Sequence, residues 1–264
     1  MRVRESLQWL EGGTRAAGTA RIAISICAFL LAWWILTATV ATNRMVLVPP
    51  YDVLVALGRE LASGAVAKNA WATSLAVALS FPVAVILGVL IGVALASNRL
   101  LTLTAGPLLT AMYSVPVVAL APLFISWLGL GLASKFVIVV LVAIFPVIVN
   151  TEVGLRSTER ALIDAARSFN ATGVQIFTTV TFPFALPFII GGIRVAWARA
   201  LVGIVVAEFF GAFAGFGFAI MAASQTFNTA TLLGYVVLIG LMGLVGSLLL
   251  SWLERRMAPW RQDA

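Results

Sequence analysis

Long apolar runs without a charged residue alternate with short polar segments along this chain. The uncharged runs cover residues 22–43, 69–98, 100–134, 136–151, 168–193 and 209–253. A helix that crosses a bilayer needs about 20 consecutive apolar residues. The pattern therefore predicts an all-α polytopic membrane protein with six transmembrane helices, at residues 22–41, 72–96, 104–128, 135–151, 189–210 and 231–252. Only Gly129-Leu130-Gly131 divides the third from the fourth, so a five-helix arrangement stays open.

Composition supports a membrane location and excludes several kinds of chemistry. Of the 264 residues, 62% are hydrophobic and 10% are charged, whereas a soluble domain has about 45–50% apolar and about 25% charged residues. The chain has no histidine and one cysteine, Cys27. Histidine-based metal sites, Ser-His-Asp and Cys-His catalysis and an intrachain disulfide are thus excluded. We interpret the net charge of +7 as positive charge held on the cytoplasmic side, not as a nucleic-acid surface.

The distribution of Lys and Arg predicts that both termini are cytoplasmic. With the N-terminus inside, 11 basic residues fall on the cytoplasmic side: Arg2, Arg4, Arg15, Arg21, Arg99, Arg156, Arg160, Arg167, Arg255, Arg256 and Arg261. Four fall outside: Arg44, Arg59, Lys68 and Lys135. Arg194 and Arg199 begin the fifth helix, and we expect both to extend toward the inner surface. This asymmetry is the one that membrane proteins show.

The domain organisation is expected to be a single transmembrane domain over residues 1–264. A cytoplasmic N-terminal segment covers 1–21 and the core covers 72–252. The first apolar run is too long for a signal peptide and contains Trp33 and Trp34, so we interpret it as an uncleaved anchor. Between the first two spans, Val53, Leu54, Leu57 and Leu61 share one face of a predicted short helix on the outer membrane surface.

The longest polar stretch, residues 152–188, predicts two short helices that project into the cytoplasm. On the first, Arg160, Asp164 and Arg167 share one face, and the opposite face holds Leu162, Ala165, Ala166 and Phe169. Ser157 or Thr158 is expected to cap its start. Asn170 is expected to end it, because Asn tolerates the left-handed conformation.

The second of these helices is expected to begin at Thr172. Thr172-Gly173-Val174-Gln175 fits a capping box, in which the first and fourth side chains bond to each other's backbone N–H groups. We expect Pro183 and Pro187 to separate this helix from the fifth span. The alternative, a pair of helices lying on the lipid surface, would call for more bulky aromatic residues and lysines on these faces.

The segment Ile163–Ala171, followed by Phe182-Pro183 and Leu186-Pro187, resembles the EAA loop of the membrane subunits of bacterial binding-protein-dependent ABC importers. Asp164 replaces the Glu of that motif and Asn170 replaces its Gly. Ser114–Leu123, Ala200–Ala212 and Leu253–Arg256 resemble the nitrate/sulfonate/taurine-type permeases. The resemblance covers roughly residues 45 to 261.

This resemblance implies the type I ABC importer permease fold and a role as a permease subunit. The chain would form the translocation pathway for a small solute, an anion such as nitrate, sulfonate, taurine or a similar organic acid. A periplasmic or lipid-anchored binding protein would deliver that solute to a bacterial cytoplasmic membrane. The other partners implied are a second permease subunit in a homodimer and two ATPase subunits, which would hold ATP and Mg.

Docking of the ATPase falls, by the same resemblance, on the EAA loop. The residues concerned are Arg160, Ile163, Asp164, Ala165, Ala166, Arg167, Phe169, Asn170, Ala171 and Thr172. The chain has no Gly-x-x-x-x-Gly-Lys-Ser/Thr loop, and neither of its two lysines, Lys68 and Lys135, follows a Gly. We therefore expect it to bind no cofactor itself and to take its energy from the partner ATPase.

Candidate pathway residues come from the polar and proline-containing parts of the spans. Pro107, Pro116 and Pro122 interrupt the third span, and carbonyl groups freed there need protein or cavity water as partners. The candidates are Tyr113, Ser114, Pro116, Trp127, Asn150, Glu208, Gln225 and Asn228. A buried polar network without a transport role is the alternative for each of them.

Glu208 and the small residues of the second span each leave two interpretations open. Glu208 either lines the outer end of the pathway or forms a structural salt bridge or cap. Gly88, Gly92 and Ala96 recur every four residues and permit close helix approach, either within the chain or between subunits.

Two other classes of function compete with the permease. A stand-alone carrier or channel would leave the helix around Asp164 without a purpose. A membrane-embedded enzyme would need paired carboxylates, histidines or a cysteine cluster within the spans, and none of these is in the sequence.

Overall fold

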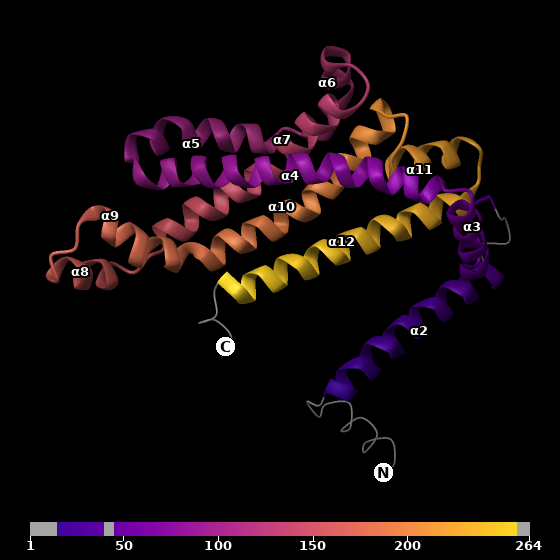
Figure 1. The fold of residues 1–264 in the computed structure, drawn as a ribbon, viewed down its shortest axis with the longest axis horizontal. Coiled ribbons are helices and arrows are strands. Elements are labelled where there is room, and N and C mark those ends of the chain that lie inside the picture. The colour runs from indigo at the N-terminus through magenta and orange to yellow at the C-terminus, as the bar shows by residue number, and fades with distance from the viewer. Residues whose placement is uncertain (1–14, 40–44, 258–264) are drawn as a thin grey trace, which may run out of the picture.

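The structure is a computed structural model that describes residues 15–39 and 45–257, and every regular element within these ranges is a helix. The helices are α2 (Arg15–Thr39), α3 (Pro50–Ala62), α4 (Ala65–Ser97), α5 (Arg99–Ser114), η1 (Val117–Leu120), α6 (Ala121–Leu128), α7 (Leu132–Arg156), α8 (Arg160–Ser168), α9 (Gly173–Ile176), η2 (Phe177–Thr181), α10 (Phe182–Gly211), α11 (Phe216–Gln225) and α12 (Thr229–Met257). Figure 1 shows the long helices side by side, with α8 and α9 at one end and α3 and α11 at the other.

The core is built around α7, which packs between α4 and α10. Val139, Ala143 and Val147 of α7 have no exposed surface. A Cβ added to Gly88 of α4 would lie 2.7 Å from Val147 Cβ, and one added to Gly92 would lie 2.6 Å from Thr151 Cβ. Small residues thus let these helices approach closely. For Gly88 and Gly92, the structure shows close approach within the chain.

The six predicted spans are present, but the third is broken. Five helices are long and apolar enough to cross a membrane, and α5 with η1–α6 makes a sixth if the bent pair counts as one span. The helix axis bends by 73° between the two parts. Pro116 lies at the break, whereas Pro107 lies inside α5 and Pro122 in the first turn of α6. Only Pro116 therefore interrupts the helix. Pro122 loses no hydrogen bond in a first turn, and a proline inside a membrane helix, such as Pro107, is tolerated where neighbouring groups satisfy the carbonyl that it frees.

The prediction that Pro183 and Pro187 separate the second short helix from the fifth span is wrong. The chain is helical from Gly173 to Gly211, through the π-helical turn η2 and into α10. Pro183 lies in the first turn of α10 and Pro187 lies inside it. Prolines are tolerated in membrane helices because neighbouring groups satisfy the backbone that they free.

The peripheral helices differ from the prediction in detail. The short helix α3 forms, but its buried side chains are Val53 and Ala56, while Leu54 and Leu61 are exposed. It packs on α12. Helix α2 extends away from the bundle in Figure 1, and its apolar stretch from Ala20 to Thr39 has no buried residue. Trp33 of α2 forms a hydrogen bond to the segment before α3, donating from Nε1 to the Val48 carbonyl over 3.1 Å.

Candidate functional site

Helices α8 and α9 form a projection at one end of the bundle (Figure 1). Asp164 and Arg167 form an exposed ion pair of 3.4 Å, and with Arg160 and Ile163 they line a shallow hollow. Ile163, Ala166 and Ala171 are half-buried, whereas Leu162, Ala165 and Phe169 are exposed. Phe169 has 86% of its surface exposed, and Val174 nearby has 74%. The chain itself leaves much of the apolar face of α8 uncovered.

The turn between α8 and α9 has the predicted local structure. Asn170 takes the left-handed conformation, with φ 58°. Thr172 forms the capping box: Gln175 N donates to Thr172 Oγ1 over 3.4 Å, and Thr172 N donates to Gln175 Oε1 over 2.8 Å. Both predictions are confirmed.

The start of α8 was predicted wrongly. Its N-cap is Glu159, whose side chain makes no capping bond. Ser157 and Thr158 instead donate to the Gly154 and Leu155 carbonyls over 3.0 Å each. They close the C-terminus of α7, because those carbonyls lack partners within the helix.

A cavity of about 260 Å³ lies where α5 breaks. Tyr113, Ser114 and Pro116 line it from the break, and Phe145 and Arg199 line it from α7 and α10. The Tyr113 and Phe145 rings pack with centroids 5.7 Å apart. We expected Arg199 to extend toward the inner surface, but its side chain lines this cavity.

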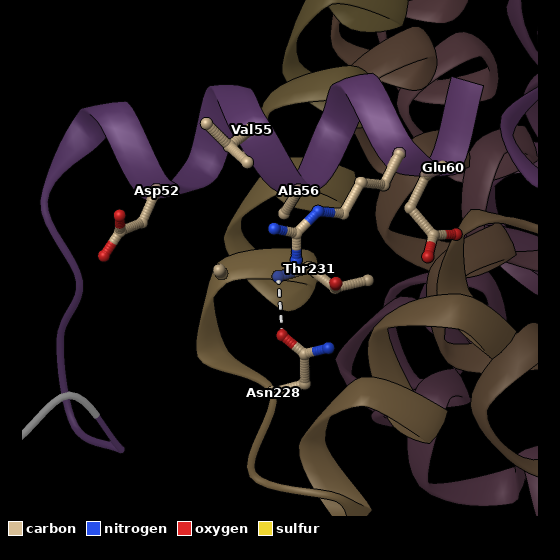
Figure 2. Close-up of a pocket in the computed structure, with 8 residues that line it drawn as sticks. Asp52, Val55, Ala56, Glu60, Asn228 and Thr231 are labelled. Carbon is tan, nitrogen blue, oxygen red and sulfur yellow. Dashed lines mark hydrogen bonds between the residues drawn. The ribbon is translucent and has the colours of Figure 1, made fainter. Parts of the chain in front are cut away.

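The other pathway candidates lie apart from this cavity. Trp127 is exposed on α6, and Gln225 is exposed at the end of α11. Asn150 turns back on its own helix and donates from Nδ2 to the Pro146 carbonyl over 2.8 Å. Asn228 caps α12 by accepting from Thr231 N over 3.2 Å, and it lies in a hollow beside Asp52 and Glu60 of α3 (Figure 2). Three of the eight candidates thus share one cavity.

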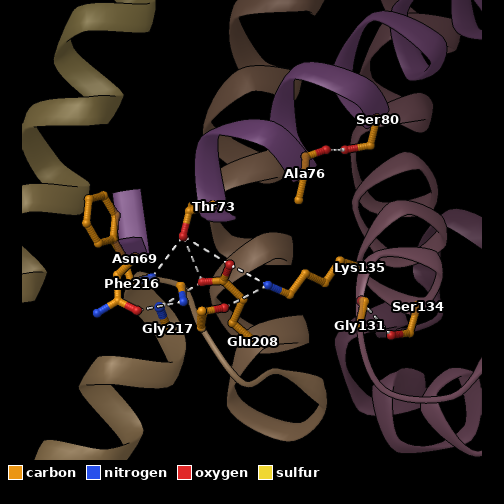
Figure 3. A network of polar contacts seen from close by, with 12 residues as sticks. Asn69, Thr73, Ala76, Ser80, Gly131, Ser134, Lys135, Glu208, Phe216 and Gly217 are labelled. Atoms are coloured by element: carbon orange, nitrogen blue, oxygen red, sulfur yellow. Dashed lines mark hydrogen bonds and ion pairs between the residues drawn. The ribbon is translucent and has the colours of Figure 1, made fainter. Parts of the chain in front are cut away.

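Glu208 is fully buried in a polar network near the α11 end of the bundle (Figure 3). Lys135, itself only 5% exposed, donates from Nζ to Glu208 Oε1 over 2.9 Å. Thr73 Oγ1 lies 3.0 Å from both carboxylate oxygens, and Gly217 N donates to Oε2 over 2.8 Å. Of the two interpretations of Glu208, this structure contains the buried ion pair. A hydrated carboxylate lining an open path is not what it shows.

The network also fixes the segment that joins α10 to α11. Lys135 Nζ donates to the Ala214 carbonyl over 2.9 Å, and Phe216 N donates to Thr73 Oγ1 over 2.8 Å. Gly215 N donates to Asn69 Oδ1 over 3.0 Å. Gly215 has φ 134°, and a Cβ there would collide with the Glu208 carboxylate. The segment can therefore follow this path only with glycine at position 215.

A second hydrogen-bonded chain extends the network toward α3. Tyr235 of α12 donates from its hydroxyl to Glu60 Oε2 over 2.7 Å, and Asn69 Nδ2 donates to the same hydroxyl over 3.1 Å. We did not predict Asn69, Thr73, Gly215 or Tyr235 as site residues. The one usable signal was Lys135, a single cation between two long uncharged runs.

At the opposite end, Arg194 of α10 reaches α12. Its Nη2 forms an ion pair with Glu254 and lies 3.3 Å from Ser251 Oγ. Arg194 and Glu208 cannot pair with each other, because the 14 residues between them correspond to about 21 Å along the helix.

Comparison with known proteins identifies the family. Residues 61–262 match the binding-protein-dependent transport system inner membrane component family, and the chain belongs to it. It is therefore the permease subunit of an ABC importer, a multi-pass protein of the inner membrane.

Three relatives illustrate the range of proteins that this chain resembles. It is 31% identical over 191 residues to the formylaminopyrimidine transport permease protein ThiX of Halalkalibacterium halodurans, covering 72% of this chain and 76% of that one. It is 30% identical to the putative aliphatic sulfonates transport permease protein SsuC of Bacillus subtilis, covering 88% and 84%. It is 28% identical to the taurine transport system permease protein TauC of Escherichia coli, covering 90% and 89%.

A solved structure shows the same fold. A chain of the methionine ABC transporter MetNI, in inward facing conformations, superposes with a TM-score of 0.61 at 20% identity. The match covers 72% of this chain and 94% of that one. The expected type I ABC importer permease fold is confirmed.

Proposed function

We propose that two copies of this chain form the translocation pathway for a small organic anion, and that two ATPase subunits drive it by docking on the α8–α9 projection. ATP and Mg²⁺ are bound by those ATPase subunits. A binding protein outside the membrane delivers the anion. Rigid-body movement of the docked subunits then alternates access to the pathway.

The observation that carries this proposal is the uncovered apolar face of α8. Leu162 and Phe169 are exposed on a segment that extends beyond the bundle. Exposed apolar groups rimmed by charges such as Asp164 and Arg167 are typical of a surface that binds another protein. A stand-alone carrier has no use for such a surface.

The sulfonate group is the anionic feature that the names of two relatives share. Two of the three relatives above are named for aliphatic sulfonates and for taurine. The third is named for formylaminopyrimidine.

The proposed orientation has both termini and the α8–α9 projection in the cytoplasm. It is supported by the Lys and Arg distribution. Single cysteines at Ser63 and Ser168, introduced separately with Cys27→Ser, test it, because these exposed residues lie at opposite ends of the bundle. In intact cells, a membrane-impermeant maleimide should label only the position-63 thiol. Labelling of only the position-168 thiol contradicts the orientation.

Docking is tested by co-expressing the tagged chain with the ATPase of the same transporter. Ala165→Trp adds bulk to the exposed apolar face of α8, and Asp164→Lys reverses the central charge of the opposite, charged face. Both variants should insert normally but lose ATPase co-purification and ATP-driven uptake of taurine or methanesulfonate into proteoliposomes. Leu103→Trp, at an exposed position of α5, is the matched control and should keep the ATPase.

Two results contradict the proposal. Full ATPase recovery with both α8 variants would place docking elsewhere on the chain. Uptake by the purified chain without any ATPase would instead support the stand-alone carrier.

A further inference from the structure

Helix α10 carries two arginines whose surroundings differ. Arg194 is paired with Glu254 near the end of α12. Arg199, five residues further along, has no acidic partner among the residues that the structure describes. Among the described residues, helix α10 thus holds one arginine that is paired with a carboxylate and one that is not.

Arg199 lies near the middle of α10, away from both ends of this spanning helix. Gly192 of α10 packs against Asn150 of α7, and Gly203 packs against Val142. Arg199 lies between these two contacts and borders the same cavity as Phe145, which is near the centre of the 25-residue helix α7. The centre of a bilayer is about 15 Å from either edge of the hydrocarbon. Lipid headgroups are therefore out of reach as partners for Arg199.

A second copy of this chain cannot supply the missing carboxylate either. Of the Asp and Glu residues within the described ranges 15–39 and 45–257, only Glu208 lies in the interior of a span, away from the helix ends. It is already held by Lys135, Thr73 and Gly217. An arginine at this depth is costly unless it faces protein partners or a water-filled cavity. The charge of Arg199 is thus available to a ligand.

The cavity beside Arg199 has the size and walls of a small-solute site. Its volume is about 260 Å³, slightly below the about 300–1,000 Å³ that ligand pockets span. Tyr113 and Phe145 form an aromatic wall, and Ser114 brings a hydroxyl group. A guanidinium group binds sulfonate or carboxylate oxygens with two parallel N–H donors.

We infer that Arg199 holds the transported anion at mid-membrane depth, in the cavity that it shares with Tyr113 and Ser114. The inference rests on the proposed function for the anionic cargo. One isolated cation suits transport, because binding must be favourable enough for entry and weak enough for release. The ligand class is a small monoanion with a sulfonate or carboxylate group.

The test measures the charge preference of the cavity with two thiol reagents of opposite charge. Ser114→Cys is combined with Cys27→Ser, and the full-length chain is placed in nanodiscs, where both membrane faces are accessible. Sulfonatoethyl methanethiosulfonate is itself an aliphatic sulfonate, and its trimethylammonioethyl counterpart is a cation. The ratio of their reaction rates should favour the sulfonate. Arg199→Gln should lower that ratio about tenfold or more, because a charge in a low-dielectric cleft raises the local concentration of its counter-ion.

Two further variants and a competitor make the result specific. Arg199→Lys should keep the preference for the sulfonate reagent. Arg194→Gln, the same change on the same helix, should leave the ratio unaltered. Methanesulfonate at millimolar concentration should slow labelling by the sulfonate reagent with Arg199 present and not with Arg199→Gln.

The inference is overturned if the rate ratio is the same with Arg199 and with Arg199→Gln. It is also overturned if neither reagent reacts at position 114, because the cavity is then closed to water. The assay uses no ATPase and no binding protein. Failure of ATPase docking would therefore appear in the co-purification experiment and leave this rate ratio unchanged.

Discussion

The two ends of the helical bundle use charged side chains in opposite ways. At the α11 end, Glu208 and Lys135 are buried and bonded to each other, to Thr73 and to the backbone of the α10–α11 segment. At the α8 end, Asp164 and Arg167 form an exposed pair of 3.4 Å. A buried pair fixes one arrangement of the surrounding helices, because separating it leaves a charge without a partner. The two residues of an exposed pair can bond to water or to another protein instead of to each other. Their surface is therefore free to bind a partner.

This comparison predicts where a substitution changes folding and where it changes only assembly. Breaking one partner of a buried ion pair costs about 3–5 kcal/mol. A surface change away from such features stays within about 0.5 kcal/mol. Substitutions at the two ends should therefore separate stability from coupling to the ATPase.

The largest effect is expected from Glu208→Gln. It leaves the Lys135 ammonium buried without a carboxylate, so we expect a loss of about 3–5 kcal/mol in the free energy of unfolding. Thermal unfolding of the detergent-purified chain measures this loss. Lys135→Met combined with Glu208→Met removes both charges and should recover much of the stability. An unchanged melting temperature for Glu208→Gln would show that the buried pair does not hold this end together.

Gly215→Ala is expected to have the next largest effect. The backbone at φ 134° costs about 1–3 kcal/mol for a residue with a Cβ, and here the Cβ would also collide with the Glu208 carboxylate. Gly64→Ala is the matched control, because Gly64 has φ 76° but open space around it. The melting temperature should fall further for Gly215→Ala. Equal losses in the two variants would mean that contact with Glu208 adds nothing to the backbone strain.

Asp164→Lys should have the smallest effect on stability. The pair with Arg167 is two-thirds exposed on both sides, and exposed helix pairs at i,i+3 or i,i+4 spacing contribute only about 0.2–0.5 kcal/mol. The melting temperature should therefore stay close to that of the parent chain, while ATPase recovery falls. A loss of stability as large as that of Glu208→Gln would show that α8 is part of the folded core.

The sequence was sufficient for the spans and for local turn chemistry. Uncharged runs located the six spans because a charge inside a bilayer is costly whatever its neighbours are. Asn170 and the Thr172 capping box were predictable because each depends on residues within four positions. The glycine turn at 129–131 followed from the same local rules, whereas the rule that predicted an interruption at three prolines held only at Pro116.

Contacts between distant segments were not predictable in the same way. Lys135 and Glu208 are 73 residues apart, and nothing in either local pattern selects the other. Helix α11 was missed because its ten residues lie inside one long uncharged run and carry no polar pattern. Arg199 was expected at the inner surface, because the sequence does not show that α10 begins several residues earlier and carries this arginine deeper.

The uninterrupted helix from Gly173 to Gly211 has a mechanical consequence. Its 39 residues make a helix about 58 Å long. The Thr172 cap lies at one end of this helix, and Arg199 and Glu208 lie further along it. On the proposed function, a movement of the α8–α9 projection would reach the cavity and the buried ion pair along this one helix, and Pro187 and the π-helical turn are the places where it could bend. The π-helical turn Phe177–Thr181 determines which side chains of α10 face the neighbouring helices. Deleting Thr179 would rotate the rest of this helix by about 100° about its axis. The helix could still move with α8 and α9, but Arg199 would no longer face the cavity and Glu208 would no longer face Lys135.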